Sequence, residues 1–466
     1  TILLEQNYRS PTTILNAPNA VIERNPGRKP KRLWSDLGAG EPIVGYVADT
    51  EHEEADWIAR EIDRLTDAGI ARPADIAVFY RTNAQSRVFE EIFIRLGLPY
   101  KVVGGVRFYE RKEVRDALAY LRAVVNPDDT VSIRRILNTP RRGIGDRAQA
   151  CVEALASRDR ISFTQALQRA DDAPGIGPRA VNAIRDFLSL LDDLRRLAET
   201  SPPEDVLEAV LHRTGYVSML EDSHDPQDAG RLENLQELVS VAREYTERTA
   251  AAGEEPTLAG FLEQVALVAD ADEVPDAAPD AAGVVTLMTL HTAKGLEFPV
   301  VFMTGLEEGV FPHDRSLADP RELEEERRLA YVGITRARSR LYLTRAVTRS
   351  AWGQPQYNPP SRFLDELPAE LVRWERTEAA VTSWRGTSTR SGPAGRPSER
   401  PGGRLTTASQ LPKVPALSPG DRVNHQRYGL GRVLAVQGTG ARAQAQIDFG
   451  DQVLWIVLRY SPMEKL

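Results

Sequence analysis

Three segments of the chain carry side chains whose types suit the binding of nucleotides or phosphate. The first is Glu5-Gln-Asn-Tyr-Arg-Ser10. Tyr8 could stack on a base, and the planar, permanently charged guanidinium of Arg9 could reach phosphate oxygens. The same residues could instead start a helix, with Ser10 as the cap and Pro11 in the first helical position. The segment alone leaves both interpretations open.

The second segment, Thr289-Leu-His-Thr-Ala-Lys-Gly-Leu-Glu-Phe298, lies between two buried strand patterns at 284–290 and 300–303. Polar residues in such a position fall at the carboxyl end of a strand, which is the usual ligand edge of an α/β sheet. His291 would then face a ligand. Alternatively, His291 could cap a helix and Lys294 could be solvated.

The third segment is a helix that the sequence predicts from a cap at Asp319 through Arg338. On this helix Leu329, Val332 and Arg336 lie at positions i, i+3 and i+7, so Arg336 projects from the face that otherwise seeks the core. A charge in that position needs a partner. The partner is either an acidic side chain or the γ-phosphate of a nucleotide, with Arg336 acting as an arginine finger.

Two further segments, Pro140-Arg-Arg-Gly-Ile-Gly-Asp146 and Pro174-Gly-Ile-Gly-Pro178, place Gly-Ile-Gly before a helical pattern. Glycines expose amide N–H groups at the start of a helix, where phosphate binds favourably. Such a turn can also be no more than a tight connection between helices.

The sequence patterns around these segments predict an α/β protein with an inserted helical domain, and its helices and strands would position the segments. Helix and strand patterns alternate at 55–65, 76–80 and 88–96. The pattern is mostly helical from about 108 to 282, strand signals return near 284, and the α/β pattern fades after Arg362. Residues 382–415 are rich in Ser, Thr, Gly, Pro and Arg and predict a flexible tether. The last 50 or so residues combine period-two patterns with glycine turns, which predicts a small β-barrel.

Composition limits the possible classes of protein. A chain of 466 residues predicts about three domains, and no apolar run approaches the roughly 20 residues that span a bilayer. The formal charge of −8 argues against wrapping nucleic acid by overall charge, so any such binding must be local. Cys151 is the only cysteine, which excludes an intramolecular disulfide and a cysteine-based zinc site. Cytoplasm is the expected location, and no membrane partner is expected.

Together the segments resemble the later motifs of UvrD/PcrA-type superfamily 1 DNA helicases. Gln6-Asn-Tyr-Arg-Ser10 resembles the fourth motif, Thr289 to Glu297 the fifth, and Tyr331-Val-Gly-Ile-Thr-Arg-Ala337 the sixth. Residues 79–87, 108–113 and 358–363 look like further stretches of the same family. The resemblance covers nearly the whole chain.

This resemblance implies a role for each matching residue. Tyr8 would stack on adenine, Arg9 and Arg336 would contact the γ-phosphate, and Glu297 would hold the ribose. His291, Asn83 and Trp352 would contact single-stranded DNA, although Trp352 could also be a buried core residue. The helical insertion would meet duplex DNA through residues of the two glycine segments: Arg141, Arg142, Gly143, Gly145, Gly175 and Gly177.

The resemblance also implies a domain plan. Residues 1–107 and 284–375 would form a second RecA-like lobe, of the P-loop type but without the P-loop. Residues 108–283 would form the all-α insertion and 376–415 a disordered linker. Residues 416–466 would form a Tudor-like barrel, which binds RNA polymerase in related proteins.

One requirement of a superfamily 1 motor is missing from the chain. Gly-Lys-Thr and Gly-Lys-Ser, which end the phosphate-binding loop, do not occur, and Asp-Glu occurs only at 272–273 and 365–366. The first motor lobe, expected to hold most of the Mg²⁺ contacts, would therefore have to be supplied as a partner. No metal-ligating residue is expected in this chain, and the chain alone is expected not to hydrolyse ATP.

The function expected from these features is the C-terminal portion of an ATP-dependent 3′-to-5′ DNA helicase for repair or replication, with ATP and Mg²⁺ as cofactors. The alternative is a non-catalytic adaptor, derived from a helicase, that binds DNA or RNA polymerase. A helicase-nuclease fusion is disfavoured because the tail lacks a nuclease-like cluster of carboxylates and lysine.

Overall fold

The computed structural model describes residues 5–28, 31–271, 283–351, 353–377, 421–425, 429–437, 444–448, 453–457 and 463–465. The chain divides into two compact units, Thr1–Ser388 and Thr389–Leu466, which are described separately below. Among the described residues, no helix is both long enough and apolar enough to cross a membrane.

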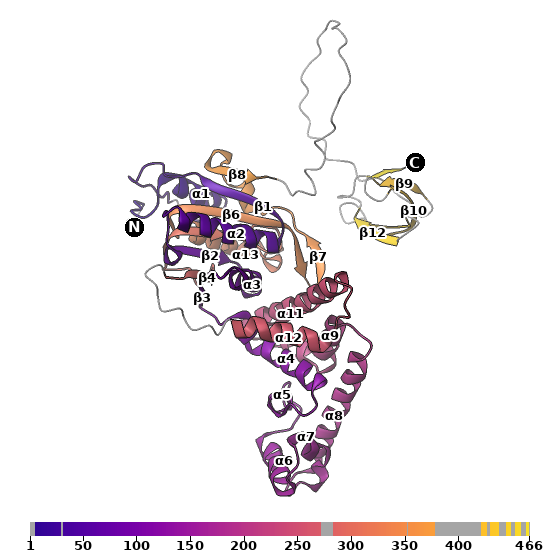
Figure 1. The fold of residues 1–466 in the computed structure, drawn as a ribbon. Coiled ribbons are helices and arrows are strands. Elements are labelled where there is room, and N and C mark those ends of the chain that lie inside the picture. The colour runs from indigo at the N-terminus through magenta and orange to yellow at the C-terminus, as the bar shows by residue number, and fades with distance from the viewer. Residues whose placement is uncertain are drawn as a thin grey trace. The chain divides into compact units, whose positions relative to one another are not determined.

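A largely parallel sheet of eight strands organises the first unit (Figure 1). Seven strands follow the order β3-β4-β2-β5-β6-β1-β8, and β7 pairs with β6 beside this path. Every pairing is parallel except that of β6 with β7. The strands are β1 (Ile43–Thr50), β2 (Ile76–Tyr80), β3 (Tyr100–Val103), β4 (Val285–Thr289), β5 (Phe298–Met303), β6 (Ala337–Ala351), β7 (Gln354–Tyr357) and β8 (Val372–Arg376). This arrangement confirms the α/β prediction and fits a RecA-like fold.

Helices cover both faces of this sheet, and each face has its own apolar core. One core joins α1 (Thr12–Glu23) and α13 (Pro320–Ile334) to the sheet, and the other joins α2 (Glu51–Asp67) and α3 (Ser86–Leu96) to it. Strand β2 supplies Phe79 to the first core and Val78 to the second. A strand buried on both faces needs apolar residues at every position, which explains why β2 reads as a continuous apolar run.

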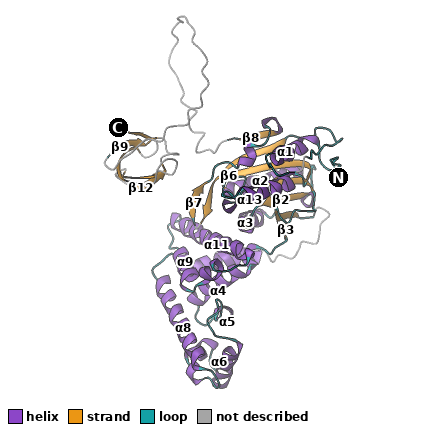
Figure 2. Cartoon of the chain, turned by 180° about the vertical axis from the view of Figure 1, so that it is seen from behind, coloured by secondary structure: helices purple, strands orange, loops and turns teal. Residues whose placement is uncertain are grey.

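A run of helices with a third core separates β3 from β4 in the chain. These helices lie together and largely apart from the sheet in both views (Figures 1 and 2). They are α4 (Lys112–Val125), α5 (Thr130–Ile136), α6 (Asp146–Asp159), α7 (Phe163–Gln168), α8 (Pro178–Ala198), α9 (Pro203–Arg213), α10 (Tyr216–Glu221), α11 (Pro226–Ala251) and α12 (Leu258–Ala271). Their apolar residues recur with helical spacing, so each helix buries one stripe in this core.

The second unit contains five antiparallel strands in the order β12-β11-β10-β9-β13. They are β9 (Arg422–His425), β10 (Gly429–Gln437), β11 (Gln444–Asp448), β12 (Val453–Val457) and β13 (Met463–Lys465). Among the described residues, no pairing joins β12 to β13. Closure into a barrel therefore stays a prediction, and most of the predicted linker lies outside the described residues.

Two local predictions were wrong, and one of two open alternatives does not hold. The helix predicted to continue to Arg338 ends at Ile334, and β6 begins at Ala337. The alternative in which Ser10 caps a helix does not hold, because the helix near Pro11 begins at Thr12 without a side-chain cap. The α/β pattern does not fade after Arg362, because the short helix α14 (Arg362–Asp365) and strand β8 follow, and β8 extends the sheet beside β1.

Candidate functional site

Segments far apart in the sequence meet where β5 and β6 begin. The guanidinium of Arg9 forms an ion pair with the carboxylate of Glu297, the residue before β5. Arg9 Nη1 also donates to the carbonyl oxygen of Thr335, at a distance of 3.2 Å. Thr335 caps the end of α13, so Arg9 joins the chain's first segment to both of the later motifs.

The backbone around Arg9 is fixed by its neighbours. Asn7 Oδ1 accepts hydrogen bonds from the amides of Arg9 (2.7 Å) and Ser10 (3.0 Å), which closes a tight turn. The hydroxyl of Ser10, which is fully buried, donates to the carbonyl oxygen of Ala337. The role of Ser10 is therefore to hold this turn against the start of β6, and not to cap a helix.

Arg336 lies beside Arg9 at the junction between α13 and β6. Its guanidinium donates to the carbonyl oxygens of Val332 (3.1 Å) and Leu296 (3.2 Å). Burial, and next the charge of Arg9, lower the pKa of Arg336, while Glu297 acts in the opposite direction. Arginine nevertheless stays charged in proteins, so this half-buried cation would gain from a nearby anion.

The charges around Glu297 do not balance. Arg9 and Arg338 both lie within ion-pair distance of this carboxylate, with Arg338 Nη1 at 3.8 Å. Among the described residues, Arg336 has no ion pair of its own. Three guanidinium groups therefore lie around a single carboxylate. The resulting positive field suits a phosphate group. The predicted meeting of Arg9, Glu297 and Arg336 is present in the structure.

Tyr8 stands beside this cluster with 79% of its surface exposed. Its hydroxyl donates to Gln6 Oε1 at 2.7 Å, and Gln6 in turn donates to Asp36 Oδ2 at 2.9 Å. An exposed ring with a tethered hydroxyl is available for stacking on a flat aromatic ligand such as a nucleobase.

The connection from β4 to β5 reaches both edges of the sheet. The amide of Leu290 donates to the carbonyl oxygen of Tyr80, where β2 ends, whereas Glu297 lies where β5 begins. Strands β4, β2 and β5 are parallel, so residues 290–297 cross from the carboxyl edge to the amino edge. The carboxyl-edge prediction therefore holds for His291 and fails for Glu297.

His291 lies at the surface of the carboxyl edge. Partial burial, and next the charge of Arg81, lower the pKa of His291, while Glu326 raises it. Arg81 is itself paired with Glu326 at 2.7 Å. The imidazole is therefore neutral at pH 7 and can donate or accept a hydrogen bond.

The backbone of Gly104 and Gly105 lies between Asn83 and the segment that contains His291. Gly104 has a φ of +83°, and a Cβ built there would lie 2.6 Å from Thr292 Cγ2. A Cβ on Gly105 would lie 3.9 Å from the side-chain oxygen of Asn83, which is exposed. Sequence reasoning missed Gly104, Gly105 and Thr292; the Gly104-Gly105 pair after a strand was the available signal.

Both Gly-Ile-Gly segments end at the start of a helix. Gly145 precedes α6 and Gly177 precedes α8, and neither helix has a side-chain cap. Gly143 and Gly175 have φ values of +85° and +80°. The isoleucine of each segment packs against the helical core, which leaves uncapped amides at the helix starts.

The two arginines before Gly143 differ in their surroundings. Arg141 is exposed, and no hydrogen bond or ion pair joins it to another residue that the structure describes. Arg142 turns inward, donates to the carbonyl oxygens of Ile136 and Pro140 (both 3.1 Å) and lies over the rings of Tyr120 and Phe187. Arg142 therefore holds the loop in place, and its predicted contact with DNA stays untested.

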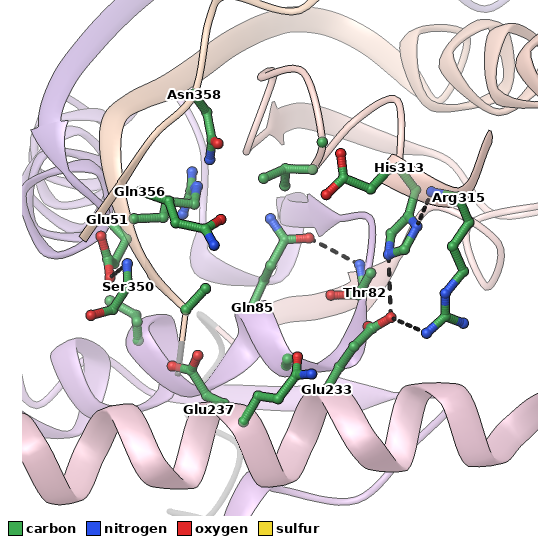
Figure 3. Close-up of a pocket in the computed structure, with 18 of the residues that line it drawn as sticks. Glu51, Thr82, Gln85, Glu233, Glu237, His313, Arg315, Ser350, Gln356 and Asn358 are labelled. Atoms are coloured by element: carbon green, nitrogen blue, oxygen red, sulfur yellow. Dashed lines mark hydrogen bonds and ion pairs between the residues drawn. The ribbon is translucent and has the colours of Figure 1, made fainter. Parts of the chain in front are cut away.

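A cavity of about 330 Å³ lies between α11 and the β6–β7 hairpin (Figure 3). Glu51, Gln85 and Glu237 are among its lining residues. None of Arg9, Glu297 or Arg336 lines it, so it is separate from the cluster that these three residues form. Trp352 lies outside the described residues, although the neighbouring amide of Gly353 donates to Ser240 Oγ at 2.9 Å.

Comparison with known proteins agrees with these motifs. The family model described as UvrD-like helicase C-terminal domain matches residues 2–348. The ATP-dependent DNA helicase UvrD1 of Mycobacterium tuberculosis is 56% identical over 479 residues, which cover 100% of this chain and 61% of that protein. The ATP-dependent DNA helicase PcrA is 42% identical in Bacillus subtilis and 40% identical in Staphylococcus aureus, with 62% of each protein covered. The chain thus spans about three fifths of the length of these relatives.

Proposed function

This chain belongs to the UvrD-like helicase C-terminal domain family, and from that premise we propose that it supplies the second RecA-like lobe of an ATP-dependent DNA helicase. The observation that carries the proposal is the cluster of Arg9, Glu297 and Arg336 at the amino edge of the sheet. An adaptor that only binds DNA or protein has no use for a phosphate-binding cluster of this kind.

The residues of the cluster fit ATP. Arg9 and Arg336 carry the charge that a γ-phosphate needs, Tyr8 offers an exposed ring for adenine, and Glu297 offers acceptors for ribose hydroxyls. Glu297 is already engaged with arginine, and the chain has no Gly-Lys-Thr or Gly-Lys-Ser sequence. We therefore assign most of the Mg²⁺ contacts to a first motor lobe that acts as a partner.

In this proposal Arg336 acts as the arginine finger. ATP bound between two lobes would draw Arg9 and Arg336 onto its γ-phosphate, which favours the closed arrangement of the lobes. The closed state would end when the phosphate is hydrolysed and released, so that ATP turnover drives a cycle of closing and opening.

The connection from β4 to β5 would couple this cycle to DNA. Its last residue, Glu297, belongs to the phosphate-binding cluster, and His291 lies at the opposite edge with Thr292, Gly104 and Asn83. We assign single-stranded DNA to that edge and to Trp352. A translocating motor needs contacts that tolerate any base sequence, which backbone contacts and stacking provide. Movement in the 3′-to-5′ direction is part of the proposal.

Residues 108–283 would be the all-α domain that meets duplex DNA. The uncapped helix starts at Gly145 and Gly177, with Gly143, Gly175 and Arg141, suit the phosphates of a DNA backbone. In this proposal Arg142 supports the loop that presents them.

The remaining parts of the domain plan follow the family. Residues 1–107 and 284–375 would form the RecA-like lobe, 376–415 a linker, and 416–466 a Tudor-like barrel that binds RNA polymerase. We place the protein on DNA in the cytoplasm, in repair or replication.

The proposal is tested by ATP hydrolysis with excess single-stranded DNA and Mg²⁺. The chain is assayed alone and after mixing with a separately made first motor lobe of the 56% identical relative. Activity that arises only on mixing is the expected result. No activity in the mixture, together with retained binding of DNA or RNA polymerase, would support the adaptor instead.

A further inference from the structure

We propose that Asp36 is a positioning residue of the nucleotide site, which acts through Gln6 to hold the ring of Tyr8 ready for stacking on a base. This inference rests on the function proposed above, because it takes Tyr8 to be the residue that meets the base. Asp36 lies outside the three segments whose residue types suggested nucleotide binding. Its contacts in the folded chain connect it to the first of them.

Two hydrogen bonds in series join Asp36 to Tyr8. Gln6 Nε2 donates to Asp36 Oδ2 at 2.9 Å, and the Tyr8 hydroxyl donates to Gln6 Oε1 at 2.7 Å. An ionised carboxylate can only accept hydrogen bonds, so it requires the NH₂ group of the Gln6 amide to face it. The amide oxygen must then face Tyr8. Asp36 therefore decides which end of the Gln6 amide the tyrosine hydroxyl meets.

The backbone holds Asp36 in place from both sides. The amide of Asn7 donates to the carbonyl oxygen of Trp34 at 2.8 Å, and the amide of Thr12 donates to the carbonyl oxygen of Gly38 at 2.8 Å. These bonds anchor the chain two residues before Asp36 and two residues after it. The carboxylate is thus carried by backbone that is fixed against the chain's first segment.

The Tyr8 ring needs such a restraint. With 79% of its surface exposed, the ring is free to turn about its side-chain bonds unless its hydroxyl is held. A ring that is already oriented loses less conformational freedom when a base stacks on it. The bonds through Gln6 should therefore strengthen stacking although Asp36 itself does not touch the base.

The charge of Asp36 makes the direction of its effect diagnostic. No ion pair joins Asp36 to another residue in the described part of the chain, and ATP is a polyanion. By charge alone, removal of this carboxylate should strengthen ATP binding. Loss of the restraint on Tyr8 should weaken it.

The first measurement is the KM for ATP of the full chain mixed with the first motor lobe. Asp36→Ala should raise this KM about three- to tenfold, as expected for the loss of one hydrogen bond, with little change in kcat. Asp36→Asn keeps an acceptor for Gln6 and should restore the wild-type KM. Asp67→Ala is the matched control, because Asp67 is also exposed and no hydrogen bond or ion pair joins it to another described residue.

A substrate without a base isolates the contribution of stacking. Ribose 5-triphosphate keeps the ribose and the phosphates of ATP but offers no base to Tyr8. Its KM should be the same in the wild type and in Asp36→Ala. An equal rise in KM for both substrates, or a lower KM for ATP in Asp36→Ala, would overturn the proposal.

The second measurement uses the full chain alone and requires no ATP hydrolysis, so inactive mixed lobes would count against the proposed function and not decide the role of Asp36. Fluorine NMR of the chain labelled with 3-fluorotyrosine reports on the Tyr8 ring, and Tyr8→Phe identifies its resonance. In Asp36→Ala this resonance should become narrower and move toward that of free 3-fluorotyrosine, because the released ring turns freely. It should not move in Asp36→Asn or Asp67→Ala. A Tyr8 resonance that is the same in the wild type and Asp36→Ala would contradict the positioning role.

Discussion

Arg9 and Glu297 form an ion pair that joins the first segment of the chain to the connection between β4 and β5. In the proposed nucleotide site these two residues have different ligands, since Arg9 would take the γ-phosphate and Glu297 the ribose. ATP must therefore separate a pair that the chain makes by itself. The Arg9–Glu297 pair therefore holds the two segments together in the absence of nucleotide. Its replacement by contacts with ATP would couple nucleotide binding to the β4–β5 connection, which carries His291.

The first prediction concerns Glu297→Gln. The side chains of Arg9 and Glu297 are 31% and 39% exposed, so loss of the pair should change the free energy of unfolding by about 1 kcal/mol or less. The KM for ATP of the reconstituted lobes should rise about tenfold, because a hydrogen bond to a charged group contributes about 1.5–3 kcal/mol. Urea denaturation and steady-state kinetics measure the two effects. An unchanged KM would remove Glu297 from the nucleotide site.

The second prediction separates Arg141 from Arg142. Arg142→Ala should lower the free energy of unfolding by about 2–3 kcal/mol, because its hydrogen bonds and ring contacts are lost. Arg141→Ala should change it by less than about 0.5 kcal/mol. Arg141→Ala should nevertheless weaken binding to duplex DNA and reduce the slope of log K against log salt by about 1. Equal stability of the two variants would contradict the structural role given to Arg142.

The third prediction concerns Gly104→Ala. Its positive φ and the contact with Thr292 should make this change cost about 1–3 kcal/mol and displace the segment that carries His291. Gly69→Ala is the matched control, because Gly69 also has a positive φ (+64°) but has no atom within 4 Å of the added Cβ. Binding of single-stranded DNA should weaken in Gly104→Ala only. A loss of the same size in both variants would mean that backbone strain alone is responsible.

The fourth prediction is a pH dependence of DNA binding that comes from His291. Its pKa is lowered in the folded chain, so the imidazole is neutral at pH 7 and gains a proton near a phosphate as the pH falls toward 6. Affinity for single-stranded DNA should rise about twofold over this range, since a charge pair about 4 Å apart in water contributes about 1 kcal/mol and only part of the population is protonated. His291→Gln should abolish this rise, and its persistence in the variant would assign it to another group.

A fall in pH should strengthen DNA binding through His291 but should reduce the contribution of His291 to the free energy of unfolding. Because the folded pKa lies below the unfolded value, the unfolded chain takes up the proton first as the pH falls. The contribution of His291 to folding is therefore complete above the unfolded pKa and is lost as the pH falls through the folded pKa.

Local patterns predicted most of the elements but not how their ends meet. The apolar run at 76–80 and the helical stripes of α2 and α3 are found where periodicity placed them. The predicted length of the helix that ends at Ile334 was too great. Arg336 and Ala337 are good helix formers, and only the pairing of β6 with β5 ends the helix there. Strand β8 was missed although Val372-Arg-Trp-Glu-Arg376 alternates, as an edge strand does.

The candidate site shows the same limit. The family motifs identified Arg9, Glu297 and Arg336, but their contacts depend on the order of strands in the sheet, which one sequence does not reveal. The contact between Gly104 and Thr292 likewise joins the end of β3 to the end of β4, two strands separated in the chain by the α4–α12 run. Contacts of that kind depend on tertiary structure and not on local spacing.

The most direct test of the account is the turnover rate for ATP of the reconstituted lobes with Arg336→Ala. Arg328→Ala is the control, because Arg328 lies on the exposed side of α13 and, within the described part of the chain, pairs only with Glu324 and Glu325 of the same helix. If Arg336 is the arginine finger, kcat should fall about 10³-fold or more in Arg336→Ala, with ATP still bound, and should be unchanged in the control. A kcat within a few-fold of the wild type in Arg336→Ala would contradict the assignment of this lobe to the chemistry of ATP.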